Sequence, residues 1–192
     1  MEIVFATGNA HKVYEIQALC PSYIQLKSLK EIGFTEEIPE TSPTIAGNSL
    51  QKANYIFERI QQAVIAEDTG LEVEYLQGLP GVNTARYAGE NATAEDNIQK
   101  LLQALGSQKN RTARFVTVIT FIERSGVVHQ FEGTCEGEIL LQKSGSKGFG
   151  YDPVFQPKGS SHSFAQMNLS QKNKYSHRAK AFRQFQAFLT KL

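Results

Sequence analysis

The feature that most constrains the fold is the apolar run at residues 63–66, Ala-Val-Ile-Ala, which leads directly into Glu67 and Asp68. A short, continuous apolar run is typical of a strand that is covered on both faces. We therefore expect a buried strand that ends at two adjacent carboxylates. An ionised carboxylate in such a place is costly unless a metal ion, a cation or several hydrogen-bond donors meet it.

The rest of the chain predicts elements that suit a sheet covered by helices. The predicted strands are residues 2–7 and 23–29 and a long antiparallel hairpin or meander over residues 113–141. Apolar residues at helical spacing predict helices over residues 10–20, 45–62, 93–105 and 175–192. Thr93 and Asp96 have the spacing of a cap for the third of these helices. Strand–helix units combined with a long antiparallel stretch indicate an α/β fold with a mixed β-sheet flanked by helices, and the length of 192 residues favours one domain.

The charge and the cysteines argue against two classes of protein. Lys plus Arg is 20 and Asp plus Glu is 19, a formal net charge of +1, whereas a general nucleic-acid binder usually carries a strongly basic face. Cys20 and Cys135 have no metal-ligand spacing, which indicates reduced thiols and no zinc site. No segment approaches the ~20 apolar residues of a membrane span, and the N-terminus does not resemble a signal peptide. We expect a soluble, cytoplasmic protein that binds neither nucleic acid nor a membrane.

Glu67 and Asp68 admit two interpretations. If the strand continues, successive side chains point to opposite faces, so one carboxylate can point into a cleft while the other braces it. Oxygen ligands with no His or Cys nearby suit Mg²⁺, which usually keeps several waters and meets substrate phosphates. The alternative is a solvated turn in which both acids cap whatever follows. The motif alone favours neither interpretation.

A second candidate site lies where the first strand leads into the first helix. Thr7, Gly8 and Asn9 form this loop, and the free amides in the first turn of a helix can bind anions. Lys12, one turn into the helix, adds a cation on the same side. The simpler interpretation is a helix N-terminus capped by Asn9. Neither the P-loop pattern nor the dinucleotide-binding pattern is matched by the glycine-rich stretches.

Two further segments carry groups that suit a nucleotide. Residues 148–155, GFGYDPVF, offer aromatic rings that can stack on a base and Asp152 to read its polar edge, although packing of the rings in the interior is the simpler outcome. His177 and Arg178 stand at the start of the last predicted helix, against its dipole, so we expect an anion to compensate them. A surface ion pair is the alternative.

These fragments follow one another in the order of a known family. FATGNxxK, PET, AEDTGLEV, LPGVNTARYAG, GFGYDPVF and SHRAKA together resemble the inosine triphosphate pyrophosphatase family, the Ham1-like pyrophosphatases of non-standard purine nucleotides, in its bacterial branch. The resemblance covers residues 3–181. It implies an elongated mixed sheet with two lobes around a central cleft, a single ITPase-like domain over residues 1–192, and a homodimer. It also implies a Mg²⁺-dependent enzyme that cleaves ITP, dITP and XTP between the α and β phosphates and so cleanses the nucleotide pool.

The resemblance assigns roles to individual positions. Asp68 matches a metal-binding acid that accepts a proton from the attacking water, Glu67 supports it, and Lys12 stabilises charge on the phosphates. Glu40, in PET, matches a second Mg²⁺ ligand. The matching substrate contacts are Thr7, Gly8, Asn9, Lys12, Asn48, Lys52, Thr69, Arg86, Phe149, Gly150, Tyr151, Asp152, Lys172, His177 and Arg178. Backbone amides and residues 176–178 are expected to donate hydrogen bonds to the 6-keto oxygen that ITP and XTP carry and ATP lacks.

Three positions depart from the family pattern. Gly47 stands where relatives often have an acid, Thr69 where many have Ser, and Glu67 where Asp is frequent. These changes bear on the expected metal geometry and leave the reaction class unchanged. Two alternatives stay open: a pyrophosphatase for other modified nucleotides, and a non-catalytic nucleotide-binding module of the same fold.

Overall fold

The computed structural model describes residues 1–191, which form two compact units. Unit 1 contains Met1–Asp68, Thr117–Gly133 and the chain from Arg178 onward. Unit 2 contains Thr69–Val116 and Thr134–His177. Within residues 1–191, every helix lacks either the length or the apolar character that crossing a membrane requires.

The strands and helices follow in chain order. The strands are β1 (Glu2–Phe5), β2 (Gln25–Ser28), β3 (Val64–Val73), β4 (Pro80–Gly81), β5 (Thr112–Ile122), β6 (Val128–Ile139) and β7 (Phe155–Pro157). The α-helices are α1 (Ala10–Gln17), α2 (Ile45–Ile60), α3 (Ala94–Leu105), α4 (Leu169–Tyr175) and α5 (His177–Leu189). Short 3-10 helices are η1 (Glu74–Leu76), η2 (Thr84–Arg86) and η3 (Phe164–Gln166).

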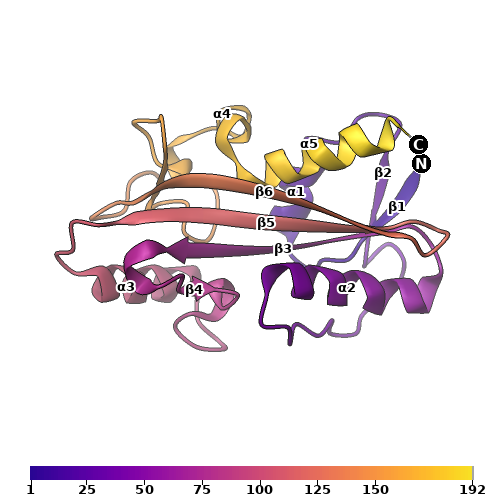
Figure 1. Cartoon of the computed structure of the whole chain (residues 1–192), viewed down its shortest axis with the longest axis horizontal. Helices are drawn as coiled ribbons and strands as arrows, with labels where there is room; N and C mark the ends of the chain where they lie inside the picture. The colour runs from indigo at the N-terminus through magenta and orange to yellow at the C-terminus, as the bar shows by residue number, and fades with distance from the viewer. Residues whose placement is uncertain (192) are drawn as a thin grey trace. The chain divides into compact units, whose positions relative to one another are not determined.

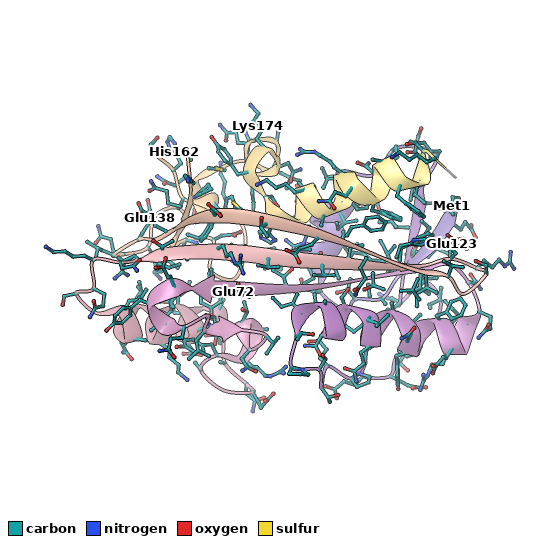
Figure 2. All side chains as sticks on the ribbon, in the orientation of Figure 1. Met1, Glu72, Glu123, Glu138, His162 and Lys174 are labelled. Atoms are coloured by element: carbon teal, nitrogen blue, oxygen red, sulfur yellow. The ribbon has the colours of Figure 1, made fainter. Side chains whose placement is uncertain are left out.

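The sheet is mixed, as the sequence predicts. Its strand order is β2-β1-β3-β5-β6-β7, with β4 paired to β3, and strands β3, β5 and β6 contribute residues to both units. β1 is parallel to both β2 and β3, whereas β4 is antiparallel to β3 and β7 is antiparallel to β6. The predicted long hairpin is β5 and β6, which are joined by the turn 123–127, where Glu123 lies (Figure 2).

In unit 1, the sheet is covered by helices on both faces, with α2 on one face and α1 and α5 on the other (Figure 1). Alternate residues of the strands enter separate cores, as a side-chain period of two requires. Ile3, Phe5 and Ile65 pack with residues of α1 and α5. Val4 and Val64 pack instead with Ala53 and Ile56 of α2. The prediction that the run at residues 63–66 is a strand buried on both faces is therefore confirmed.

Unit 2 has a core of its own between α3, the strands and the chain that follows β6. Leu71 and Val73 of β3 pack in one cluster with three leucine and isoleucine residues of α3, together with Phe115, Tyr151, Phe155 and Phe164. α3 begins with the predicted cap: Thr93 accepts a hydrogen bond from the backbone of Asp96, and the Asp96 carboxylate accepts one from the backbone of Thr93.

Several element boundaries differ from the prediction. β3 does not end at the two acids but continues to Val73, because Leu71 and Val73 alternate into the core of unit 2. The first helix ends at Gln17 rather than at residue 20, since the residue before Pro21 is disfavoured in helical conformation. The predicted last helix begins at His177, and its predicted final residue, Leu192, lies outside the described residues.

The helix α4 was missed by the sequence analysis. It starts with a capping box, in which Asn168 accepts from the backbone of Gln171 and the Gln171 side chain accepts from the backbone of Asn168. This pattern was a usable signal. The expected single domain over residues 1–192 and the expected cleft between lobes stay predictions.

Candidate functional site

The adjacent acids Glu67 and Asp68 lie inside β3, and the period of the strand sends them to opposite faces. Glu67 is two residues after Ile65 and so lies on the same face of β3, and Ile65 packs with α1 and α5. Asp68 is four residues after Val64 and so lies on the other face of the strand, and Val64 packs with α2. The two carboxylates of unit 1 therefore meet different partners.

Asp68 faces a lysine of α2. Its Oδ1 accepts a hydrogen bond from Nζ of Lys52 at 3.0 Å, and the same ammonium donates to Oε1 of Glu40 at 2.6 Å. Burial acts to lower the pKa of Lys52, but the charges of Asp68 and Glu40 outweigh it and the pKa is raised, so this lysine is charged. Burial also raises the pKa of Asp68, against the opposing charges of Lys52 and Lys12. A carboxyl group shifted in this direction is a better proton acceptor.

The loop that carries Glu40 is fastened to the start of α2. The backbone N–H of Thr41 donates to Oε1 of Gln51, and Nε2 of Gln51 donates back to Oγ1 of Thr41. The backbone N–H of Ser42 donates to Oδ1 of Asn48 at 2.8 Å. Among the described residues, Nδ2 of Asn48 is a buried side-chain nitrogen with no hydrogen-bond partner. Asn48 thus retains a donor next to the turn of helix that presents Lys52.

On the opposite face, Glu67 meets Arg178 at the start of α5. Nε of Arg178 donates to Oε2 of Glu67 at 2.6 Å and Nη2 donates to Oε1 at 2.8 Å, which is the bidentate arrangement of a strong ion pair. Nη1 of Arg178 donates to Oε2 of Glu15 on α1 at 2.5 Å. Burial alone would lower the pKa of Arg178, but the charges of Glu67 and Glu15 hold it above its usual range.

Lys12 of α1 lies at the edge of this ion pair. Its Nζ is 3.4 Å from Oε1 of Glu67 and 3.4 Å from the backbone oxygen of the same residue. Burial lowers the pKa of Lys12, and the charge of Glu67 opposes that shift. The side chain keeps 14% of its surface exposed, so a ligand can reach it.

The loop before α1 has the predicted cap. Oδ1 of Asn9 accepts from the backbone N–H groups of His11 and Lys12, and Oγ1 of Thr7 accepts from the backbone of Asn9. A Cβ at Gly8 would meet no atom within 4 Å, and the φ of Gly8 is not in the left-handed region. The fold therefore does not require a glycine there.

The predicted residues of unit 2 form a separate cluster around Asp152. Oδ2 of Asp152 accepts from Nζ of Lys172 at 2.6 Å and from the backbone N–H of Phe149 at 2.9 Å. Nζ of Lys172 also lies 5.2 Å from the centre of the Phe149 ring and 5.1 Å from that of Phe164, within the range of a cation–π contact. Asp152 and Lys172 are both almost fully buried.

The other predicted residues of unit 2 have varied surroundings. Tyr151 is buried in the core and donates from its hydroxyl to the backbone oxygen of Thr84, so the packing interpretation of this ring is confirmed. His177 is buried and stacks on Phe115, with ring centres 4.7 Å apart. Arg86 lies in η2 with Nε 3.7 Å from Glu90. Thr69, in β3, and Gly150, at a positive φ of 59°, are partly buried.

The acids of unit 1 decide what kind of metal site is possible. Within residues 1–191, no group of three or more His, Cys, Asp or Glu side chains is arranged to hold a metal ion. Glu40 and Asp68 nevertheless converge on a single ammonium group, and the Glu40 side chain is 37% exposed. Two carboxylates are the set that Mg²⁺ uses when phosphates and water supply its other ligands. Glu67 does not belong to this pair, because Arg178 and Lys12 engage its oxygens.

Glu15 belongs to this cluster of charges and was not predicted from the sequence. This residue is 5% exposed and completes the environment of Arg178. Its signal was the spacing from Lys12, because residues three apart in a helix lie on the same face. This spacing places Glu15 on the face of α1 that bears Lys12, the predicted phosphate-binding lysine, and so marks it as a candidate for the functional site.

The fold and these clusters define a class: α/β proteins in which a central strand presents acids to lysine and arginine side chains from helices on both faces. A sequence profile of the Ham1 family matches residues 3–188. The chain belongs to this family. It is 49% identical over 191 residues to the dITP/XTP pyrophosphatase of Christiangramia forsetii, and the match covers 100% of both chains.

Solved structures agree with the assignment. The Ham1 protein of Staphylococcus aureus is 38% identical, with a TM-score of 0.90 and coverage of 99% of this chain and 98% of that one. The HAM1 protein of Coxiella burnetii is 34% identical, with a TM-score of 0.91 and full coverage of both chains. The predicted family and the α/β fold with a mixed sheet flanked by helices are confirmed.

Proposed function

We propose that this protein is a Mg²⁺-dependent nucleoside triphosphate pyrophosphohydrolase that converts ITP, dITP and XTP to the nucleoside monophosphate and pyrophosphate. Relatives that bear the name dITP/XTP pyrophosphatase, among them the protein of Christiangramia forsetii, support this proposal. The observation that carries it is that the two adjacent acids of β3 have different partners on the two faces of the strand. Asp68 pairs with Lys52 and Glu40 on one face, while Glu67 is held by Arg178 and Lys12 on the other.

Asp68 is the proton acceptor in this proposal. The oxygen of a water molecule bonds to a phosphorus of the α–β anhydride, that anhydride bond breaks, and a proton of the water passes to the Asp68 carboxylate. The raised pKa of Asp68 suits this task. Pyrophosphate leaves, and the monophosphate keeps the base and the sugar. No covalent intermediate on the protein is required, because phosphate chemistry of this kind depends mainly on positioning and charge.

Cations of unit 1 bind and orient the phosphates. Lys12 reaches the surface at the edge of its ion pair with Glu67, and Lys52 links the two metal-binding acids, so each can stabilise negative charge on the triphosphate. Thr7, Gly8 and Asn9 form the adjoining loop, where the bare Gly8 backbone admits a close ligand. Asn48 adds its unpaired amide donor.

Glu40 and Asp68 would hold Mg²⁺ together with the phosphates. The metal supplies charge neutralisation and a lower pKa for a bound water. The Lys52 ammonium between the two carboxylates marks a position where a cation is favourable.

Unit 2 supplies the base-binding residues in this proposal. The ring of Phe149 offers a stacking surface beside Lys172, and Asp152 and the backbone of residues 149–152 offer polar groups for the purine edge. Thr69, Arg86, Gly150, Tyr151 and His177 stay predicted contacts, as does Arg178 in unit 1. Arg178 is 2% exposed and is held between Glu15 and Glu67.

The test is pyrophosphate release from ITP, XTP, dITP, GTP and ATP, with and without Mg²⁺, for the wild type and Asp68→Asn. We expect Mg²⁺-dependent release that is strongest with ITP, dITP and XTP and is lost in the variant. Equal turnover of ATP and GTP would contradict the base selectivity and leave the chemistry intact. Binding of ITP without release from any triphosphate would support the non-catalytic alternative. The pyrophosphatase for other modified nucleotides is tested by adding triphosphates of modified pyrimidines to the panel, and release from these alone would support it.

The proposal includes the setting of the enzyme. We propose a homodimer of single ITPase-like domains, each spanning residues 1–192, that acts on the cytoplasmic nucleotide pool. Light scattering of the purified chain checks the first part, and a particle of one chain's mass at micromolar concentration would contradict it.

A further inference from the structure

A ring of four charged side chains in unit 1, three of them buried, links Glu67 of β3 to Lys12 of α1. Arg178 lies between Glu15 and Glu67, and all three are at most 5% exposed. Glu67 also contacts Lys12, which stands three residues before Glu15 in α1. The ring therefore runs from Lys12 to Glu67, from there to Arg178 and Glu15, and back to Lys12 along one face of the helix.

We propose that Glu15 is a positioning residue for Lys12, acting through Arg178 and Glu67. This inference rests on the proposed function in taking Lys12 to be a phosphate contact. Glu15 is 5% exposed, and its ion pair with Arg178 connects it to Glu67, which Arg178 also holds. Arg178 thus offers a route from Glu15 to Glu67 and, through Glu67, to Lys12.

The balance of charge explains why Glu15 is needed in addition to Glu67. Glu67 alone would serve two cations, Arg178 with two short hydrogen bonds and Lys12 at 3.4 Å. Buried cations that share one carboxylate compete for it, and leaving one of them uncompensated is costly. With Glu15 present, the ring holds two acids and two bases and is neutral. Glu67 can then keep Arg178 and still hold the ammonium group of Lys12 in place.

The geometry explains why this matters for Lys12. A lysine side chain has several rotatable bonds, and its partly exposed ammonium group would otherwise turn into water. Two anchors limit it: the Glu67 carboxylate and the Glu67 backbone oxygen, both 3.4 Å away. Arg178 fixes that carboxylate by two hydrogen bonds, and Glu15 fixes Arg178 by a third. A displaced Glu67 therefore means a displaced Lys12.

The experiment is a double-mutant cycle with Glu15→Gln, Lys12→Gln and the combination, together with Glu15→Asp and the control Glu58→Gln. Glu58 is an exposed acid on α2. Two quantities are measured for each protein: kcat/KM with ITP, and binding of inorganic tripolyphosphate by calorimetry. Thermal midpoints show whether each variant is folded at the assay temperature.

We expect Glu15→Gln to lower kcat/KM and tripolyphosphate affinity by about 10- to 100-fold, the loss that a misplaced group typically causes. In the Lys12→Gln background, we expect Glu15→Gln to have no further effect on kcat/KM or on tripolyphosphate affinity, because the lysine through which Glu15 acts is already absent. Glu15→Asp, which keeps the charge, recovers part of the loss, and Glu58→Gln matches the wild type.

Independent losses that multiply in the double variant would overturn the proposal, as would a fall in thermal midpoint with unchanged tripolyphosphate affinity. Failure of the wild type to bind tripolyphosphate would overturn it as well. If the wild type releases no pyrophosphate from any nucleotide, the proposed function fails, but the binding cycle still decides the role of Glu15. If Glu15→Gln does not fold, Glu15→Asp carries the same test.

Discussion

At the scale of single residues, Glu67 and Asp68 are neighbours in sequence with different energetic roles. Glu67 is fully buried in a bidentate pair with Arg178, whereas Asp68 shares Lys52 with the partly exposed Glu40. We expect Glu67→Gln to lower the free energy of unfolding by about 3–5 kcal/mol, because it leaves a buried arginine without its main counter-charge. Denaturant titration measures this loss.

Asp68→Asn should give the reverse pattern. Lys52 keeps Glu40, so the cost in stability is smaller, while removal of the proton acceptor lowers kcat by about 100- to 10,000-fold. Equal losses of stability in Glu67→Gln and Asp68→Asn, or an active Asp68→Asn, would contradict a structural role for Glu67 and a catalytic role for Asp68 on opposite faces of β3.

Gly8 allows a separate test of the phosphate loop. A methyl group there meets no atom and the backbone is unstrained, so Gly8→Ala should leave stability unchanged or raise it by about 0.4–1 kcal/mol. We expect KM for ITP to rise, because the methyl group stands over the backbone that the triphosphate approaches. Gly137→Ala is the contrast, since its Cβ would fall 2.2 Å from the backbone oxygen of Gln156 and should destabilise the fold. An unchanged KM in Gly8→Ala would contradict the loop's role.

Cys20 is a free thiol in a partly buried position, and burial raises its pKa to about 11. Only the thiolate reacts with alkylating agents, so reaction with iodoacetamide at pH 8 should be about 100-fold slower than for an ordinary thiol. A Cys135→Ala background isolates the signal. The rate should rise with pH until about pH 11, and a plateau near pH 9 would refute the shift.

At the scale of elements, the cap of α3 should contribute to stability and not to activity. Thr93→Ala removes the acceptor for the backbone of Asp96 and should lower the free energy of unfolding by about 1 kcal/mol. Thr35→Ala, at an exposed loop position, is the matched control and should change it by less than about 0.5 kcal/mol. Urea titration and ITP turnover of both variants check this. A loss of activity in Thr93→Ala at full folding would mean that α3 does more than support its unit.

The elements also show what a sequence can predict. Caps such as Thr93 with Asp96, and Asn9 before α1, are local hydrogen-bond patterns, and they were predicted correctly. The end of β3 was not, because whether the chain stays extended past Asp68 depends on the core that Leu71 and Val73 find in unit 2. Likewise, the predicted candidates included Glu67 and Arg178 as separate contacts. Their pairing joins residues 111 positions apart, and no pattern within either segment encodes it.

At the scale of the whole molecule, the balance of charge should set the range of partners. The formal net charge is +1, so the chain has no strong field to attract a polyanion from a distance. The cations of the candidate site are instead paired one by one with acids: Lys12 with Glu67, and Lys52 with Asp68 and Glu40. A triphosphate concentrates several charges in a volume that one or two such lysines can serve. A duplex needs many phosphate contacts spread along a face.

We therefore expect duplex DNA to bind weakly and to leave ITP turnover unchanged at about 0.15 M salt, the physiological ionic strength. Anisotropy of a labelled duplex and an ITP assay with added DNA measure the two quantities. The dependence of kcat/KM on salt should be shallow in the wild type and shallower still in Lys12→Gln, because that variant lacks one phosphate contact. Submicromolar binding of the duplex, or inhibition of turnover by it, would mean that the exposed lysines and arginines form a basic face despite the neutral total.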